Sequence, residues 1–159
     1  MKEKKITIHI REYLLTELDP ESLQLVEEAR RATENAYAPY SAFRVGAALL
    51  LENGEIITGN NQENAAYPSG LCAERVAVFY AGARYPDVPI VALALTARKP
   101  DGFTDEPAYP CGACRQVLLE AESRSGHPIR IIMAGREKAD VVTSVKELLP
   151  KNFDRRFLE

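Results

Sequence analysis

The sequence predicts an α/β domain built on a mixed β-sheet, in which a β-hairpin is followed by a βαβαβ unit and helices cover both faces. Two strand-like apolar segments flank Asn53-Gly54, a dipeptide that favours the tight turn of a hairpin. After the hairpin, helical and strand-like segments alternate, which is typical of parallel strands joined by right-handed crossovers. We therefore expect a three-layer sandwich over residues 19–159, preceded by an N-terminal extension, residues 1–18.

The first elements are indicated by their boundary residues. Residues 5–10 alternate between apolar and polar side chains, which favours an edge strand or an extended arm. Asp19 can cap a helix and Pro20 suits the first helical position, so a helix is expected from there to about Tyr37. The two hairpin strands then follow on either side of the Asn53-Gly54 turn.

The βαβαβ part is predicted from two helix-and-strand units. Residues 71–84 are expected to form a buried helix, and residues 89–97 a strand that is covered on both faces. A polar loop with Pro and Gly leads to a second helix over residues 111–123. The apolar residues 129–133 form the last expected strand.

The composition limits the classes of function. The chain has 159 residues, of which 46% are hydrophobic and 27% charged, values typical of a globular domain. Its formal net charge is −3 and its cations are interspersed with acidic residues, which disfavours nucleic-acid binding. Its apolar runs are far shorter than a bilayer span, and no signal-peptide core follows Met1. We expect a cytoplasmic protein with a small-molecule partner, and neither nucleic acid nor membrane as partner.

Three cysteines are the main indication of chemistry. Cys72 stands two residues before Glu74, and Cys111 and Cys114 have the spacing of a zinc-binding pair. All three fall at the starts of expected helices, where free N–H groups and the helix dipole stabilise the thiolate that binds metal. Three protein ligands would leave one zinc position open, as in catalytic sites. Taken alone, either motif is explained about as well without a catalytic zinc, by a buried apolar cysteine, a redox pair or half of a structural zinc knuckle.

Together, the two motifs match the zinc-deaminase signature. In this signature a His or Cys stands two residues before a Glu, and the motif P-C-x-x-C follows later in the chain. In that signature the glutamate is a general acid/base and not a ligand. The chain resembles the small homotetrameric cytidine deaminases over nearly its whole length. The resemblance is carried by residues 36–49, 61–67, 110–117 and 148–153. Departures are confined to residues 68–70 and to a longer N-terminal segment.

The resemblance implies a reaction of pyrimidine salvage, the hydrolytic deamination of cytidine and 2′-deoxycytidine to uridine and 2′-deoxyuridine with release of ammonia. It implies a homotetramer with one Zn²⁺ per subunit. Glu74 would carry a proton from the attacking water to N3 of the pyrimidine. The implied zinc ligands are Cys72, Cys111 and Cys114.

Other residues receive roles around this centre. Arg75 is expected to hydrogen-bond the cysteine sulfurs and offset their charge, and Gln116 to support the metal site. The implied substrate-binding residues are Phe43, Asn61, Glu63, Ala73 and, reaching in from a neighbouring subunit, Phe153. Without the resemblance, these residues would be interpreted as core, a polar turn and a frayed terminus.

Other functions stay open. A deaminase of a modified cytosine nucleoside would share this chemistry, whereas a C-x-x-C thiol redox protein would need neither zinc nor Glu74. A non-catalytic zinc module requires a fourth ligand, and neither His9 nor His127 lies in a motif that would provide it. An enzyme that edits RNA or DNA would need a basic surface that the composition does not indicate.

Overall fold

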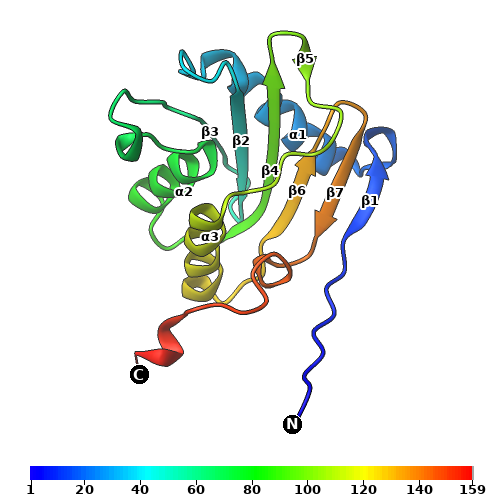
Figure 1. The fold of residues 1–159 in the computed structure, drawn as a ribbon, viewed down its shortest axis with the longest axis vertical. Helices are drawn as coiled ribbons and strands as arrows, with labels where there is room; N and C mark the ends of the chain where they lie inside the picture. The colour runs from blue at the N-terminus through cyan, green and yellow to red at the C-terminus, as the bar shows by residue number, and fades with distance from the viewer. Residues whose placement is uncertain (159) are drawn as a thin grey trace.

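A mixed seven-stranded sheet forms the middle layer of the computed structural model, which describes residues 1–158 (Figure 1). The strands follow the order β1-β7-β6-β4-β2-β3, and the short β5 pairs with β4. Their bounds are β1 Arg11–Leu14, β2 Arg44–Leu51, β3 Ile56–Asn60, β4 Ile90–Lys99, β5 Gly102–Phe103, β6 Arg130–Ala134 and β7 Lys138–Val142.

Helices cover both faces of the sheet, as the sequence predicts. Helix α1 (Pro20–Ala32) covers one face, and α2 (Ala73–Arg84) and α3 (Gly112–Ser125) lie side by side on the other (Figure 1). Short 3₁₀ turns complete the chain: Leu15–Glu17, Thr33–Asn35, Tyr67–Ser69, Val145–Glu147 and Arg155–Phe157. None of the helices in residues 1–158 is long and apolar enough to span a bilayer.

The sheet separates two apolar cores because strand side chains alternate between its faces. Ala47 and Leu49 of β2 belong to the core beneath α2 and α3. Ala48 and Leu50 of the same strand belong to the core beneath α1. The eight-residue strand β2 therefore contributes to both cores, which explains its nearly continuous apolar sequence.

The predicted hairpin is confirmed. Strands β2 and β3 pair antiparallel, with Leu50 opposite Ile56. Gly54 has a φ of 84°, a left-handed conformation that glycine adopts without steric cost.

The expected parallel pairing is confirmed for β4 and β6 but is wrong for β3 and β4. Strand β4 pairs antiparallel with β2, so β2 lies between β3 and β4. The two separated strands still run in the same direction, as the crossover through α2 requires. Alternation of elements in a sequence indicates strand direction, but it does not determine which strands are neighbours.

The N-terminal helix and arm differ in extent from the prediction. Helix α1 ends at Ala32 and continues as the 3₁₀ turn Thr33–Asn35, so the regular helix is shorter than expected. The strand expected within residues 5–10 lies later, at Arg11–Leu14, where it pairs with β7. Part of the predicted extension therefore belongs to the sheet.

Two glycines allow helices to lie close to the sheet. A Cβ on Gly46 would lie 2.0 Å from the carbonyl oxygen of Ala29 in α1, and one on Gly59 would lie 2.5 Å from that of Ala73 in α2. Both contacts are too short for any side chain other than hydrogen. Gly59 thereby sets how closely the first turn of α2 approaches the hairpin.

Candidate metal centre

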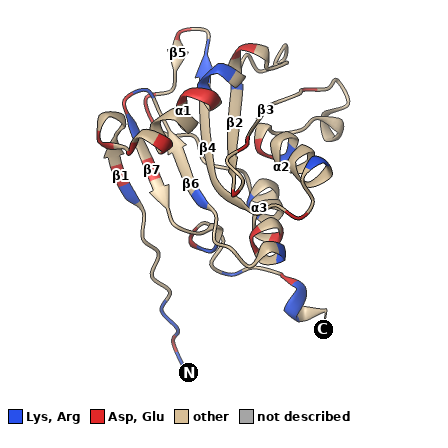
Figure 2. Ribbon diagram, turned by 180° about the vertical axis from the view of Figure 1, so that it is seen from behind, with Lys and Arg blue, Asp and Glu red and all other residues tan. Residues whose placement is uncertain are grey.

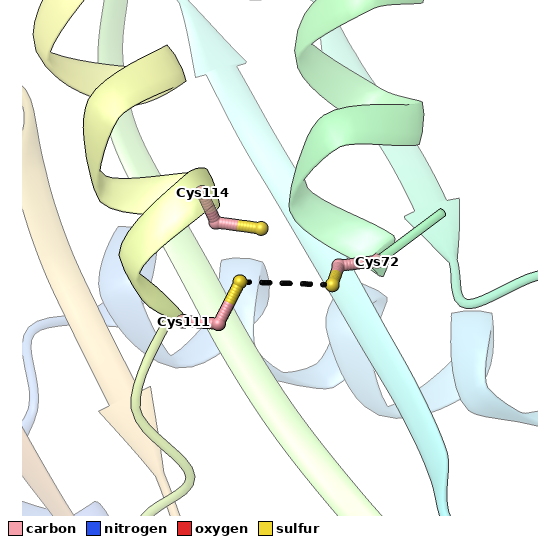
Figure 3. Close-up of side chains that lie close together, drawn as sticks. All are labelled: Cys72, Cys111 and Cys114. Atoms are coloured by element: carbon pink, nitrogen blue, oxygen red, sulfur yellow. Dashed lines mark hydrogen bonds between the residues drawn. The ribbon is translucent and has the colours of Figure 1, made fainter. Parts of the chain in front are cut away.

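The three cysteines meet where α2 and α3 begin. Cys72 is the N-cap residue of α2, Cys111 is the N-cap residue of α3, and Cys114 lies in the first turn of α3. Their sulfur atoms lie within 4.8 Å of one another (Figure 3). The thiols of Cys72 and Cys111, which are 39 residues apart in the chain, thus lie next to each other where the two helices begin.

The arrangement of the thiols fits a zinc ion. Sulfur ligands of a tetrahedral zinc, with bonds of about 2.3 Å, lie about 3.8 Å apart. The Sγ atoms of Cys72 and Cys111 are separated by 3.8 Å. Within residues 1–158, this group contains no fourth Cys, His, Asp or Glu ligand. A three-ligand site of this kind leaves one coordination position for water or substrate.

The surroundings of the thiols favour the charged form of Cys72. The helix starts provide free N–H groups and the positive end of the helix dipole. The hydrogen bond with Cys114 lowers the pKa of Cys72 to about 5, and Arg75, whose Nη2 lies 3.7 Å from the Cys72 sulfur, contributes to this shift. The hydrogen bond to Cys72, together with burial, raises the pKa of Cys114.

Glu74 is a buried carboxyl beside the thiols. Its exposed fraction is 3%, and it lies in the first turn of α2 directly after Ala73. Burial raises the pKa of Glu74 to about 7, and the charge of Cys72 acts in the same direction. A carboxyl with such a pKa both accepts and donates a proton readily near neutral pH.

Asn61 and Glu63 brace the chain around Phe43. Asn61 accepts a hydrogen bond from the Val45 N–H at Oδ1 and donates from Nδ2 to the carbonyl of Phe43, at 2.8 and 2.9 Å. Glu63 accepts hydrogen bonds from the N–H groups of Tyr40 and Ser41 and from the Ser41 hydroxyl. These polar groups therefore fix the loop that carries Phe43, a role that the sequence did not indicate.

The remaining sequence-predicted residues divide between the core and the tail. Ala73 is fully buried at the start of α2. Phe153 is 58% exposed and stacks on Phe157, with ring centroids 5.4 Å apart. The hydrogen bond of Gln116 runs from Nε2 to the carbonyl of Phe153, so it leads to the tail and not to a thiol. The role of Gln116 at the metal stays a prediction.

Two residues that sequence reasoning missed hold the loop before Cys111. Arg115 donates from Nε to the carbonyl of Pro110 and from Nη1 to that of Leu148, at 2.9 and 3.0 Å. The hydroxyl of Tyr109 donates to Asp140 of β7. The position of Arg115 next to Cys114 was visible in the sequence, but its partners are 5 and 33 residues away and only the fold reveals them.

Comparison with known proteins gives a consistent result. Residues 20–125 match the family described as the cytidine and deoxycytidylate deaminase zinc-binding region. A cytidine deaminase from Halalkalibacterium halodurans is 42% identical over 135 residues, which cover 81% of this chain and 91% of the relative. One from Sporosarcina psychrophila is 43% identical over 139 residues, covering 85% and 93%.

The fold is also similar to solved structures. The crystal structure of cytidine deaminase from Burkholderia pseudomallei superposes with a TM-score of 0.69 at 37% identity. The match covers 86% of this chain and all of the Burkholderia chain. Sequence and structure therefore agree over the region that carries the three thiols and Glu74.

Proposed function

The chain belongs to the cytidine and deoxycytidylate deaminase family, and from this premise we propose that it deaminates cytidine and 2′-deoxycytidine by hydrolysis. The products would be uridine or 2′-deoxyuridine and ammonia. The observation that carries the proposal is the convergence of three thiols, with sulfurs within 4.8 Å of one another, beside the buried Glu74.

The chemistry divides between the metal and Glu74. Cys72, Cys111 and Cys114 would hold the zinc ion, which would supply a Lewis acid able to make a water molecule nucleophilic at neutral pH. Glu74 would accept a proton from the water that attacks C4 of the pyrimidine and donate it to N3. In the second half of the reaction Glu74 would take the proton of the new C4 hydroxyl and pass it to the amine, which leaves as ammonia while the C4 carbonyl forms. The same carboxyl would thus serve as base and then as acid in each half. A pKa of about 7 suits both tasks.

Positive groups near the thiolates make this assignment electrostatically reasonable. Three thiolates contribute a formal charge of about −3 against the +2 of zinc, which would weaken the ability of the metal to acidify water. Arg75 lies 3.7 Å from the sulfur of Cys72, and the starts of α2 and α3 add partial positive charge. These groups offset the excess negative charge.

We assign the nucleoside to the side of the thiols and Glu74, next to the loop that Asn61 and Glu63 fix. Phe43 follows in this loop and would pack against the pyrimidine, with Ala73 beneath the base. Asn61 and Glu63 would bind the ribose through the hydrogen-bonding capacity that remains after they have braced the loop. Their fixed positions reduce the entropy lost when a sugar is bound.

Self-association is supported by the outer surface of α2 and α3. A groove of about 310 Å³ runs between them and is lined by Val78, Phe79, Gly82, Val117, Glu120, Ala121 and Arg124. Phe79 and the adjacent Tyr80 are about half exposed, and aromatic residues are enriched at protein interfaces. We assign this groove to a second copy of the chain within a homotetramer. A cytoplasmic location fits three thiols that are kept free for metal.

One experiment tests both the activity and the metal. Purified protein is incubated with cytidine while absorbance and ammonia are recorded, and zinc is determined by elemental analysis. We expect one zinc per chain, loss of activity after chelation, and recovery when zinc is restored. Less than about half a zinc per chain in fully active protein would contradict the metal assignment. Activity confined to a modified cytosine nucleoside would contradict the substrate assignment.

A further inference from the structure

A cationic pocket opens on the face of the sheet that carries α1. The cavity has a volume of about 470 Å³. It lies where β2 begins and β4 ends, and the end of β4 is blue in Figure 2. Lining residues are Glu34, Ala38, Ala42, Arg44, Arg98 and Lys99.

Strand register places this pocket away from the thiols. Arg44 and Arg98 are directly opposite each other on β2 and β4. They share their side of the sheet with Ala48 and Ala94, which pack in the core beneath α1. The thiols lie at the starts of α2 and α3 on the other face. The pocket forms because α1 and its 3₁₀ continuation end at Asn35 and leave this end of the sheet open.

The cations of the pocket lack neutralising partners. Like charges directly opposite on paired strands are destabilising, yet Arg44 and Arg98 occupy such positions. No ion pair between described residues, 1–158, involves either of them or Lys99. Arg44 donates to the backbone carbonyl of Glu34, and Arg98 lies 5.6 Å from the ring of Phe103. Neither contact neutralises a full positive charge. The lining of the pocket therefore carries three cationic side chains and one carboxylate, that of Glu34.

From this arrangement we propose that the pocket is a binding site for a phosphate group. A guanidinium presents several N–H donors in a planar fork that matches phosphate oxygens. Two residues that carry this group, Arg44 and Arg98, are directly opposite on paired strands and line the same pocket. A bound phosphate would remove the repulsion between Arg44 and Arg98. Lys99 would add a further charge at the rim. The phosphate could be inorganic or part of a nucleoside monophosphate, because both present the same charged oxygens.

The pocket shares a loop with the proposed nucleoside site. Ala38 and Ala42 line the pocket. Between them, Tyr40 and Ser41 donate hydrogen bonds to Glu63. Residues 38–42 therefore contact the phosphate pocket on one side and the bracing carboxylate on the other.

Calorimetric titration of the zinc-loaded protein with inorganic phosphate, at constant ionic strength set with chloride, tests the proposal. We expect one phosphate per chain. The double variant Arg44→Gln/Arg98→Gln should bind phosphate at least about tenfold more weakly, since charge-assisted hydrogen bonds are lost. Arg31→Gln/Arg84→Gln removes the same two charges from exposed positions of α1 and α2 outside the pocket and should bind phosphate like the wild type. Circular dichroism and zinc content verify that each variant is folded and loaded.

A second titration with cytidine 5′-monophosphate distinguishes the two sources of phosphate. Tighter binding than inorganic phosphate, lost in the double variant, assigns the pocket to a nucleotide. If cytidine 5′-monophosphate binds no more tightly than inorganic phosphate, and the double variant loses binding of both, the pocket is assigned to free phosphate. Absence of phosphate binding at about 10 mM, or binding that the double variant retains unchanged, would overturn the proposal. The retained binding would place the anion elsewhere, for example at the metal.

Discussion

The carboxyl of Glu74 is the single side chain on which the proposed reaction depends most. Glu74→Gln keeps the size of the side chain but cannot carry a proton, so zinc content and fold should be unchanged. Activity should fall at least ~10²–10⁴-fold, the usual contribution of general acid/base catalysis. Steady-state rates with cytidine measure the effect. Glu52→Gln, in the exposed hairpin turn, makes the same chemical change and should be fully active. Wild-type rates in Glu74→Gln would exclude the proton-transfer role.

Asn61 and Glu63 lead to a prediction about substrate choice. Free cytosine lacks the sugar that these residues are proposed to bind, although it presents the same amino group to the metal centre. Sites built to hydrogen-bond a substrate group can reject analogues without it by ~10⁴–10⁵ in kcat/KM. We expect discrimination of this order between cytidine and cytosine, measured by initial rates on each. Similar kcat/KM values would remove the ribose-binding role.

At the residue scale, spacing predicted some features of the site and not others. The thiols and Glu74 are separated by two or three positions within each motif, so helical geometry alone relates them. The braces made by Asn61 and Glu63 join residues 16 to 23 positions apart, and a polar turn in a sequence does not specify such partners. The cationic pocket was missed for a related reason. Arg44 and Arg98 become neighbours only through the register of β2 and β4.

At the scale of elements, the start of α1 offers a quantitative test. Asp19 accepts hydrogen bonds from the N–H and hydroxyl of Ser22, and its carboxylate lies 3.2 Å from Arg130. Asp19→Ala removes this cap and should lower the free energy of unfolding by ~0.5–2 kcal/mol. Chemical denaturation at neutral pH measures the loss. Glu28→Ala on the same helix should cost less, because its ion pair is with the solvent-exposed Arg31 and contributes little.

The pH dependence of this cap follows from the pKa of Asp19. The hydrogen bonds from Ser22 lower that pKa from its ordinary value of 3.8. A lowered carboxyl pKa stabilises the folded state fully above the ordinary value, and the stabilisation is lost as pH falls through the pKa of the folded protein. The difference between wild type and Asp19→Ala should therefore be constant from pH 5 to 8 and shrink in strongly acidic solution. An undiminished difference there would show that the charge is irrelevant to the cap.

Elements with strong local signals were predicted and the others were not. The hairpin has its Asn-Gly turn, and both α2 and α3 follow loops with clear breaks. Strand β7 (Lys138–Val142) was missed because it is five residues long and contains Lys138 and Asp140. Its stability comes from pairing with β6 and β1, which local sequence does not reveal. The order of strands likewise depends on packing between segments distant in the chain.

At the scale of the whole molecule, two of the exposed aromatic regions of one chain are pairs of side chains. Phe79 and Tyr80 lie along α2, and Phe153 and Phe157 stack on each other in the C-terminal tail. The tail is nevertheless held in place, since Gln116 donates a hydrogen bond to the carbonyl of Phe153. An exposed aromatic side chain on a fixed backbone is suited to contact another molecule. A tetramer would cover the helix surface and present Phe153 to a neighbouring site.

This assembly makes its own prediction. Light scattering should give a mass of about four times 17.7 kDa at assay concentration.

Phe153→Ala should leave the zinc content and the tetramer intact but raise the KM for cytidine by ~10-fold or more, because burying one such ring against the substrate contributes ~1.5–3 kcal/mol. Leu158→Ala removes an exposed apolar side chain from the same tail and should leave KM unchanged, since Leu158 has no proposed substrate contact. A fully active monomer would refute the shared site. A tetramer in which Phe153→Ala has wild-type kcat and KM would retain the assembly but remove Phe153 from the substrate pocket, because the ring would then cover protein and not pyrimidine.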